Sequence, residues 1–153
     1  MIKYKITNEL HPQNSNLKRI RALRDIPRHN VKAGDLGGYV ESEDNLSQKG
    51  DSWVGDAACV FGEAVVHGDA VVYGKALVFG EARVFGKAEV FGKARVFGKA
   101  LVFDDAWVFG NARVSDEAWI YSKAEVCGEA SVCGDARVCG EAYVCGNMSL
   151  GFR

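Results

Sequence analysis

Several features that would mark a membrane, secreted or ice-binding protein are missing from this sequence. No apolar run approaches the roughly 20 residues of a transmembrane helix, and residues 1–7 lack the apolar stretch of a secretory signal. We therefore expect a cytoplasmic protein with no membrane partner. The single threonine, Thr7, excludes an ice-binding solenoid, which depends on regular threonine columns.

Charge and proline are also limited. The formal net charge is −1 and 25% of the residues are charged, so the whole chain has no field that favours nucleic acid. The two prolines, Pro12 and Pro27, lie outside the repeats, which leaves every repeat amide free to donate to a β-ladder. The five cysteines, in a chain without a secretory signal, are expected to be free thiols.

What the sequence has in abundance is a six-residue repeat. The unit Val-x-Gly-x-Ala-x runs from Val54 to Ser149, and a degenerate first copy begins at Gln48. The first position is valine at fifteen sites, and the fifth is alanine at fifteen consecutive sites. The third position is glycine in twelve of sixteen copies and aspartate or serine in the others. A fixed period of this kind indicates a solenoid of stacked repeats.

Strand geometry gives each repeat position a direction. Side chains alternate along an extended strand, so the first and fifth positions point inward together. Glycine or aspartate at the third position tolerates the positive φ of a corner. We therefore predict an all-β fold, a parallel β-solenoid with three hexads per coil and about five to six coils. It divides the chain into a small N-terminal β cap (1–47), the solenoid (48–149) and a C-terminal tail (150–153).

The charges offer a test of the coil size. With three hexads per coil, residues 18 positions apart stack along one edge, about 4.8 Å from each other. On one such edge the fourth position alternates in sign from coil to coil, which favours this register; a flat coil of two hexads stays open as the alternative. The alternating residues are Asp69, Lys87, Asp105, Lys123 and Glu141.

The Val-x-Gly-x-Ala-x units resemble the repeats of the trimeric acyltransferase-like hexapeptide superfamily. The resemblance covers residues 48–149 and implies a left-handed parallel β-helix that forms oligomers, commonly trimers. Glycine stands at the third position here, whereas many enzymes of that superfamily carry it at the second. The stretch 31–47, followed by Gly50-Asp-Ser-Trp-Val54, resembles the entry segment of uncharacterised bacterial and phage solenoid proteins. That second resemblance implies an accessory or prophage-encoded protein.

Enzymes of that superfamily use a histidine base and hold coenzyme A between subunits, often beside a loop that interrupts the coils. Here His11 and His29 lie in the cap, only His67 lies in the repeats, and no loop interrupts residues 54–149. A general base must reach its proton in a sheltered pocket, so we expect His67 to be a surface residue and no residue to be catalytic. The three histidines are not placed to converge on one zinc ion as in the related zinc carbonic anhydrases, and no cofactor is expected. An acyl-CoA-dependent acyltransferase with His67 as its base stays the alternative.

Four cysteines recur at six-residue spacing, at positions 127, 133, 139 and 145. Consecutive members fall on different faces of a triangular coil, so they cannot form one tetrahedral metal site. Only Cys127 and Cys145 share a face, one coil apart, where a disulfide is geometrically possible. The simpler interpretation is that each of these cysteines is a small apolar side chain at the second repeat position, which holds phenylalanine in most earlier repeats. Cys59, at a sixth position, is expected to be exposed.

The second repeat position carries aromatic rings that point outward or lie along a corner. Either the rings stack on one another, or at least one ladder is buried against a partner, since a monomer rarely exposes a large apolar patch. We predict an interaction surface for a homo-oligomer, a dimer or trimer, or for a protein partner. The predicted surface consists of Phe61, Tyr73, Phe79, Phe85, Phe91, Phe97, Phe103, Phe109, Tyr121 and Phe152.

Residues 1–30 carry seven basic side chains against two acidic ones. We expect these charges to be solvated and to protect a strand edge from pairing with another chain. A site for an acidic protein or a nucleic acid is the alternative. At the other end, residues 150–153 are short for a cap, so Phe152 folding over the last coil, head-on dimerisation and partner docking are further expectations. The basic residues in question include Lys18, Arg19, Arg21, Arg24 and Arg28.

These observations predict a non-catalytic β-solenoid that acts by binding and assembling. If the similarity of residues 31–54 to bacterial and phage solenoid proteins is a guide, the partner is a host protein, for example a component of a defence system.

Overall fold

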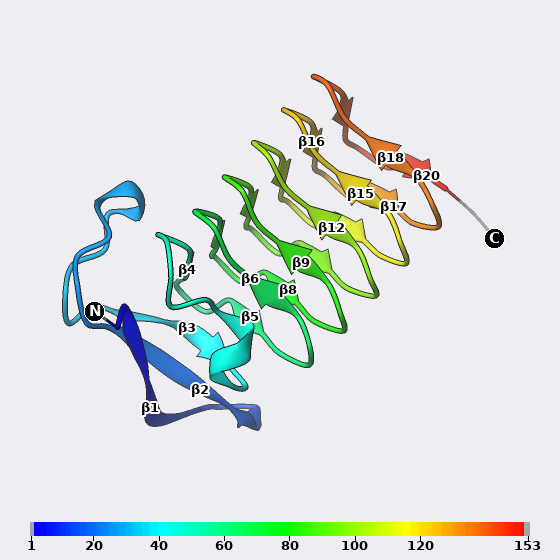
Figure 1. Ribbon diagram of the computed structural model, residues 1–153. Helices are drawn as coiled ribbons and strands as arrows, with labels where there is room; N and C mark the ends of the chain where they lie inside the picture. The colour runs from blue at the N-terminus through cyan, green and yellow to red at the C-terminus, as the bar shows by residue number, and fades with distance from the viewer. Residues whose placement is uncertain (1, 152–153) are drawn as a thin grey trace.

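The computed structural model describes residues 2–151 and consists of a β-solenoid that follows an N-terminal cap (Figure 1). In the cap, β1 (Tyr4–His11) pairs antiparallel with β2 (Asn14–Ala22), which pairs antiparallel with β3 (Leu36–Val40). Two 3-10 turns, η1 (Pro27–His29) and η2 (Glu43–Asn45), are the only helical elements among the described residues.

The solenoid consists of two-residue strands, one in each hexad. Each strand covers the sixth position of one repeat and the first position of the next. The strands are β4 (Trp53–Val54), β5 (Cys59–Val60), β6 (Val65–Val66), β7 (Val71–Val72), β8 (Leu77–Val78), β9 (Arg83–Val84), β10 (Glu89–Val90), β11 (Arg95–Val96), β12 (Leu101–Val102), β13 (Trp107–Val108), β14 (Arg113–Val114), β15 (Trp119–Ile120), β16 (Glu125–Val126), β17 (Ser131–Val132), β18 (Arg137–Val138), β19 (Tyr143–Val144) and β20 (Ser149–Leu150).

Three sheets form the sides of the solenoid, and their strands within the solenoid pair in parallel. The nine-stranded face runs β1-β2-β3-β5-β8-β11-β14-β17-β20, the six-stranded face joins β4 to β19, and the five-stranded face joins β6 to β18. Val90 pairs with Val72 and with Val108, 18 residues away in each direction. The predicted three-hexad coil is therefore confirmed, and the flat two-hexad alternative is wrong. The solenoid has about six coils, and Figure 1 shows them stacked along one axis.

The interior is filled by the two columns predicted from the sequence. Every first-position residue from Val54 to Val132, and every alanine of the fifth position from Ala58 to Ala130, is fully buried. The alanines have a small side chain at the narrow corners, and the valines fill the space between the sheets. The buried residues of successive coils pack on one another and form a single core that is continuous along the axis.

The corners have the left-handed backbone that the third position predicts. The repeat glycines from Gly50 to Gly146 have φ between 61° and 71°. A side chain at most of these sites would press on the next coil: a Cβ built on Gly92 would lie 2.9 Å from the amide nitrogen of Gly110. Aspartate or serine replaces glycine at four corners with φ of 54–58°, at Asp56, Asp104, Asp116 and Ser122.

The cap continues one side of the solenoid. Glycines such as those of residues 33–39 are typical of turns, yet β3 covers Leu36–Val40 and pairs in parallel with β5. Gly37 and Gly38 allow this contact, because a Cβ on either would lie 2.5 Å from a carbonyl oxygen of Val54 or Ala58. The two glycines therefore serve close approach of strands rather than a turn.

The cap also satisfies carbonyl groups of the first coil. The buried side chain of Asn45 donates from Nδ2 to the carbonyls of Gly62 (3.1 Å) and Ala64 (2.9 Å), and the amide of Ser47 donates to Val66 (3.0 Å). An unpaired strand edge invites association, and the cap removes it at this end. The expected contact of Phe152 with the last coil lies outside the described residues.

Candidate functional site

The predicted aromatic surface forms three ladders, one along each side of the solenoid. Adjacent rings lie 4.8–5.1 Å apart between centroids, and their planes differ by 1–9°. The ladders are Phe61–Phe79–Phe97, Tyr73–Phe91–Phe109 and His67–Phe85–Phe103–Tyr121.

The rings shield one another, as the stacking interpretation predicts. Each of the nine described rings of the predicted surface is half-buried rather than exposed. Such pairs stabilise a fold by about 0.5–1.5 kcal/mol each. The ladders therefore have a structural role inside one chain, and burial of a ladder by a partner stays a prediction. The tenth member, Phe152, lies outside the described residues.

Two tryptophans extend these ladders onto the sheet surface. Trp107 lies edge-on to Phe91 and Phe109, with ring centroids 6.0 and 6.4 Å away, and 40% of it is exposed. Trp119 is less exposed, because the guanidinium of Arg137 lies 4.0 Å from its ring centroid. Further along the six-stranded face Tyr143 is 66% exposed. The six-stranded face therefore presents the solenoid's most exposed aromatic side chains among the described residues.

The corner between the five-stranded and six-stranded faces carries the alternating charges. Lys87, Asp105, Lys123 and Glu141 are all exposed, and we call these four residues the charged edge. Within residues 2–151 none of the four has an ion-pair or hydrogen-bond partner for its charged group. They line a shallow hollow of about 560 Å³. The first member of the predicted column, Asp69, is instead paired with the cap through Arg28 at 3.6 Å.

His67 lies at the start of a ladder rather than in a catalytic arrangement. Its ring stacks on Phe85 at 4.8 Å. Burial, together with the charge of Arg83, lowers the pKa of His67 below its usual value, so the imidazole is neutral at pH 7. Its ring nitrogens make no hydrogen bond to the part of the chain that the structure describes, so no such bond orients the ring.

The cysteines are divided between two environments. Cys127 and Cys145 form a disulfide between successive coils, with Cα atoms 4.5 Å apart, so the expectation of five free thiols was wrong for these two. They are the pair that share a face one coil apart, where the sequence made a disulfide geometrically possible. Cys133 and Cys139 are free thiols at the surface. The expectation that Cys59 is exposed was wrong: it is buried beside Leu17 and Tyr39 of the cap, and burial raises the pKa of its thiol to about 11.

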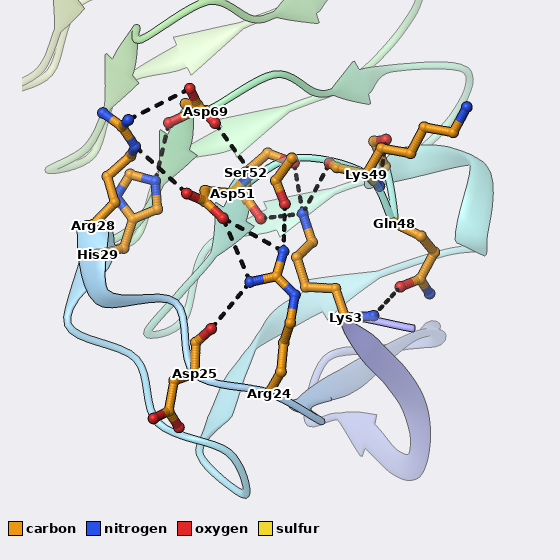
Figure 2. A network of polar contacts seen from close by, with 12 residues as sticks. Lys3, Arg24, Asp25, Arg28, His29, Gln48, Lys49, Asp51, Ser52 and Asp69 are labelled. Atoms are coloured by element: carbon orange, nitrogen blue, oxygen red, sulfur yellow. Dashed lines mark hydrogen bonds and ion pairs between the residues drawn. The ribbon is translucent and has the colours of Figure 1, made fainter. Parts of the chain in front are cut away.

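Several basic residues of the cap have partners within the chain, and Arg24 and Arg28 have theirs where the cap meets the solenoid. Figure 2 shows Arg24 directed at Asp51. Its guanidinium also donates to the carbonyl of Gly50 at 2.7 Å. Arg28 lies 3.8 Å from Asp51 and also contacts Asp69. Arg19 bonds to Glu9 at 3.0 Å. These contacts give three of the seven basic side chains of residues 1–30 an acidic partner within the chain.

Lys3 lies at the centre of the same network and was not singled out from the sequence. It is fully buried, and its Nζ donates to the carbonyl (2.6 Å) and hydroxyl (2.9 Å) oxygens of Ser52 (Figure 2). Burial, and secondly the charge of Arg24, lowers the pKa of Lys3 to about 8. Lys3 is 49 residues from Ser52 in the chain, so no local pattern could have indicated this contact.

A groove that the sequence also did not indicate lies between the cap and the first coils. Its volume is about 610 Å³, which is in the range of small-molecule sites. Trp53, Gly55, Val71 and Tyr73 of the six-stranded face line one side of it, and residues 28–36 of the cap line the other.

Among residues 2–151 no group of three or more histidine, cysteine, aspartate or glutamate side chains is arranged to hold a metal ion. No described helix is long and apolar enough to cross a membrane. No protein-family model matches the sequence, and no curated protein matches it.

Proposed function

We propose that this protein is a non-catalytic binding and assembly module whose solenoid pairs with a second copy through the charged edge. The observation that supports the proposal is that the four charges of this edge alternate in sign, face solvent and have no partner in the described chain. Charges with such an arrangement give little stability to a single chain. They can give specificity to an interface.

The order of the charges is complementary to itself when reversed. A two-fold axis between the coils of Asp105 and Lys123 sets Asp105 against Lys123 of the second copy, and Lys87 against Glu141. Every charge of the edge then faces an opposite charge, and each contact occurs twice, as an isologous interface requires. Side-by-side pairing in the parallel sense would place like charges together. The pattern therefore favours an antiparallel dimer.

Apolar side chains flank this edge on both sides. Trp107 and Tyr143, the exposed aromatic residues of the six-stranded face, lie two positions beyond Asp105 and Glu141. On the five-stranded face, Phe103 and Tyr121 lie two positions before Asp105 and Lys123. A rim of paired charges beside large aromatic groups is typical of protein interfaces.

The proposal extends to the setting in which the module acts. A cytoplasmic location is part of the same proposal. The resemblance of residues 31–54 to phage solenoid proteins supports a phage or prophage accessory role, in which the assembled solenoid binds a host protein. Acyl transfer is not proposed, because His67 stacks on Phe85 and no hydrogen bond orients it. An acetyl-CoA titration in which binding is saturable and lost in His67→Ala would reverse this choice.

Light scattering coupled to size-exclusion chromatography tests the assembly. We expect a dimer that weakens as salt rises, because exposed ion pairs are screened. Trp107→Asp, which adds a charge beside the edge, should give a monomer of unchanged circular dichroism. Ser131→Asp is the matched control, since it also changes the net charge by −1, on the nine-stranded face, and should leave the dimer intact. A wild-type monomer at every concentration would refute the proposal.

A further inference from the structure

One rung is missing from the aromatic ladder of the six-stranded face. Tyr73, Phe91 and Phe109 stack at 4.9 Å, but the coil before Tyr73 has Gly55 at the second repeat position. The amide of Gly55 donates to Val72 at 2.8 Å, so Gly55 is in register directly before Tyr73. The face of the Tyr73 ring that points toward the cap therefore has no ring stacked on it.

Backbone geometry does not require glycine at this site. Gly55 is not among the residues with positive φ, unlike the corner glycines. A Cβ built on it would meet only ordinary contacts, 3.6 Å from the Cβ of Tyr73 and from Cδ1 and Nε1 of Trp53. The missing side chain leaves a space beside Tyr73, and this space belongs to the groove of about 610 Å³ under the cap.

A donor with no partner in the described chain adjoins the same space. Trp53 is only 3% exposed, and its indole packs under the cap near Gly37. Its Nε1–H lies 3.6 Å from the site of the absent Cβ and has no hydrogen-bond acceptor among residues 2–151. Every buried side-chain nitrogen and oxygen of the described residues has a hydrogen-bond partner, so this nitrogen is open to the groove and can donate to a ligand atom with a lone pair.

The rim of the groove sets the charge of the ligand. Asp35, Asp56 and Glu89 contribute three carboxylates. Each already accepts one hydrogen bond within the chain, from the amide of Lys32, the amide of Gly74 and the hydroxyl of Tyr73 respectively, and has a second oxygen for a ligand. Arg28 is the one basic side chain with a permanent charge on the rim, and it is engaged with Asp51 and Asp69. His29 is neutral because burial lowers its pKa. Carboxylates accept hydrogen bonds from amino or hydroxyl groups and repel phosphate.

We propose that this groove binds a planar, uncharged nitrogen heterocycle of the nucleobase class, with its ring in the place of the missing rung. The ring stacks on Tyr73, a ring nitrogen accepts from Nε1 of Trp53, and amino or sugar hydroxyl groups donate to the carboxylates of the rim. Val31 and Leu36 of the cap cover the opposite face of the ring. The excess of carboxylates selects a nucleoside over its phosphate ester.

Titration with adenosine and with adenosine monophosphate, followed by calorimetry and by amide chemical shifts, tests this site. We expect saturable adenosine binding at least tenfold tighter than binding of the monophosphate, with shifts centred on Gly55 and Tyr73. Gly55→Phe should restore the ladder, keep or raise the melting temperature, and weaken adenosine binding at least tenfold. His67→Phe is the control, because it adds the same ring at the second position on another face and should leave binding unchanged.

Failure to bind adenosine, or equal binding by the Gly55→Phe protein, would overturn the proposal. If Gly55→Phe does not fold, Gly55→Leu fills the same space with a smaller group and is held to the same criterion. Tighter binding of the monophosphate would also overturn it, because the rim charge would then have the wrong role. The groove does not include the charged edge, so these results are independent of the oligomeric state.

Discussion

A carboxylate in place of Val90 tests the inward direction of the first repeat position. Val90 is fully buried and lies between Val72 and Val108 of the adjacent coils. Removing a buried valine costs about 1.5–3 kcal/mol. Keeping the new carboxyl protonated at pH 7, about three units above its usual pKa, costs about 4 kcal/mol more. The sum is close to the whole stability of a typical domain, about 5–15 kcal/mol, so Val90→Asp should unfold at least the coils around it.

The pH dependence of this variant identifies the cause. The folded-state pKa of the new carboxyl is raised, so its penalty is absent below the unfolded value and grows as pH rises. Between pH 4 and 7 the variant should lose about 1.4 kcal/mol per pH unit relative to wild type. Lys93→Asp, three residues away and exposed, is the control and should change stability by no more than about 0.5 kcal/mol.

Urea denaturation followed by far-UV circular dichroism measures both proteins. A Val90→Asp protein within about 1 kcal/mol of wild type at pH 7 would refute the inward assignment of the valine column, since exposed substitutions have effects of that size.

Three further outcomes follow from particular contacts. The pKa of Lys3 is lowered from 10.5 to about 8 in the folded protein, so between these values the folded state binds fewer protons than the unfolded state. The stability of wild type relative to Lys3→Met should therefore rise with pH in that window. A difference in urea midpoints that does not change with pH would contradict this. Gly92→Ala should cost at least about 1–2 kcal/mol, because φ is +68° and the Cβ would press on the next coil, whereas Gly55→Ala should be nearly neutral; equal thermal shifts would be inconsistent with this. Protein purified without reductant and then denatured should show three reactive thiols, and Cys127→Ser should show four; five in the wild type would exclude the disulfide.

The solenoid was predictable because its determinants repeat. Valine and alanine columns at a fixed period fix the strand direction, and the alternation from Asp69 to Glu141 indicated the coil size that the register confirms. The six-residue pattern occurs sixteen times, so a single exception, such as Asp104 or Ser122 at a corner, does not obscure it. The ladders followed from the same register.

The cap was less predictable, because its contacts join residues far apart in the chain. Gly37 and Gly38 resemble turn residues locally, and only their approach to Val54 and Ala58 shows that they lie in a strand. Cys59 has the repeat position of an exposed residue, but Tyr39 of the cap covers it. The groove had one sequence signal that could have been used: Gly55 interrupts the aromatic column at the second position.

Mixing two charge-reversed proteins tests the proposed assembly most directly. Lys87→Glu with Lys123→Glu makes the charged edge wholly acidic, and Asp105→Lys with Glu141→Lys makes it wholly basic. We predict that each protein alone is a monomer by light scattering and that an equimolar mixture at low salt forms a dimer containing one copy of each. Dimers of either reversed protein alone, or a mixture that stays monomeric while the wild type is dimeric, would contradict the proposal that opposite charges of this edge join two copies.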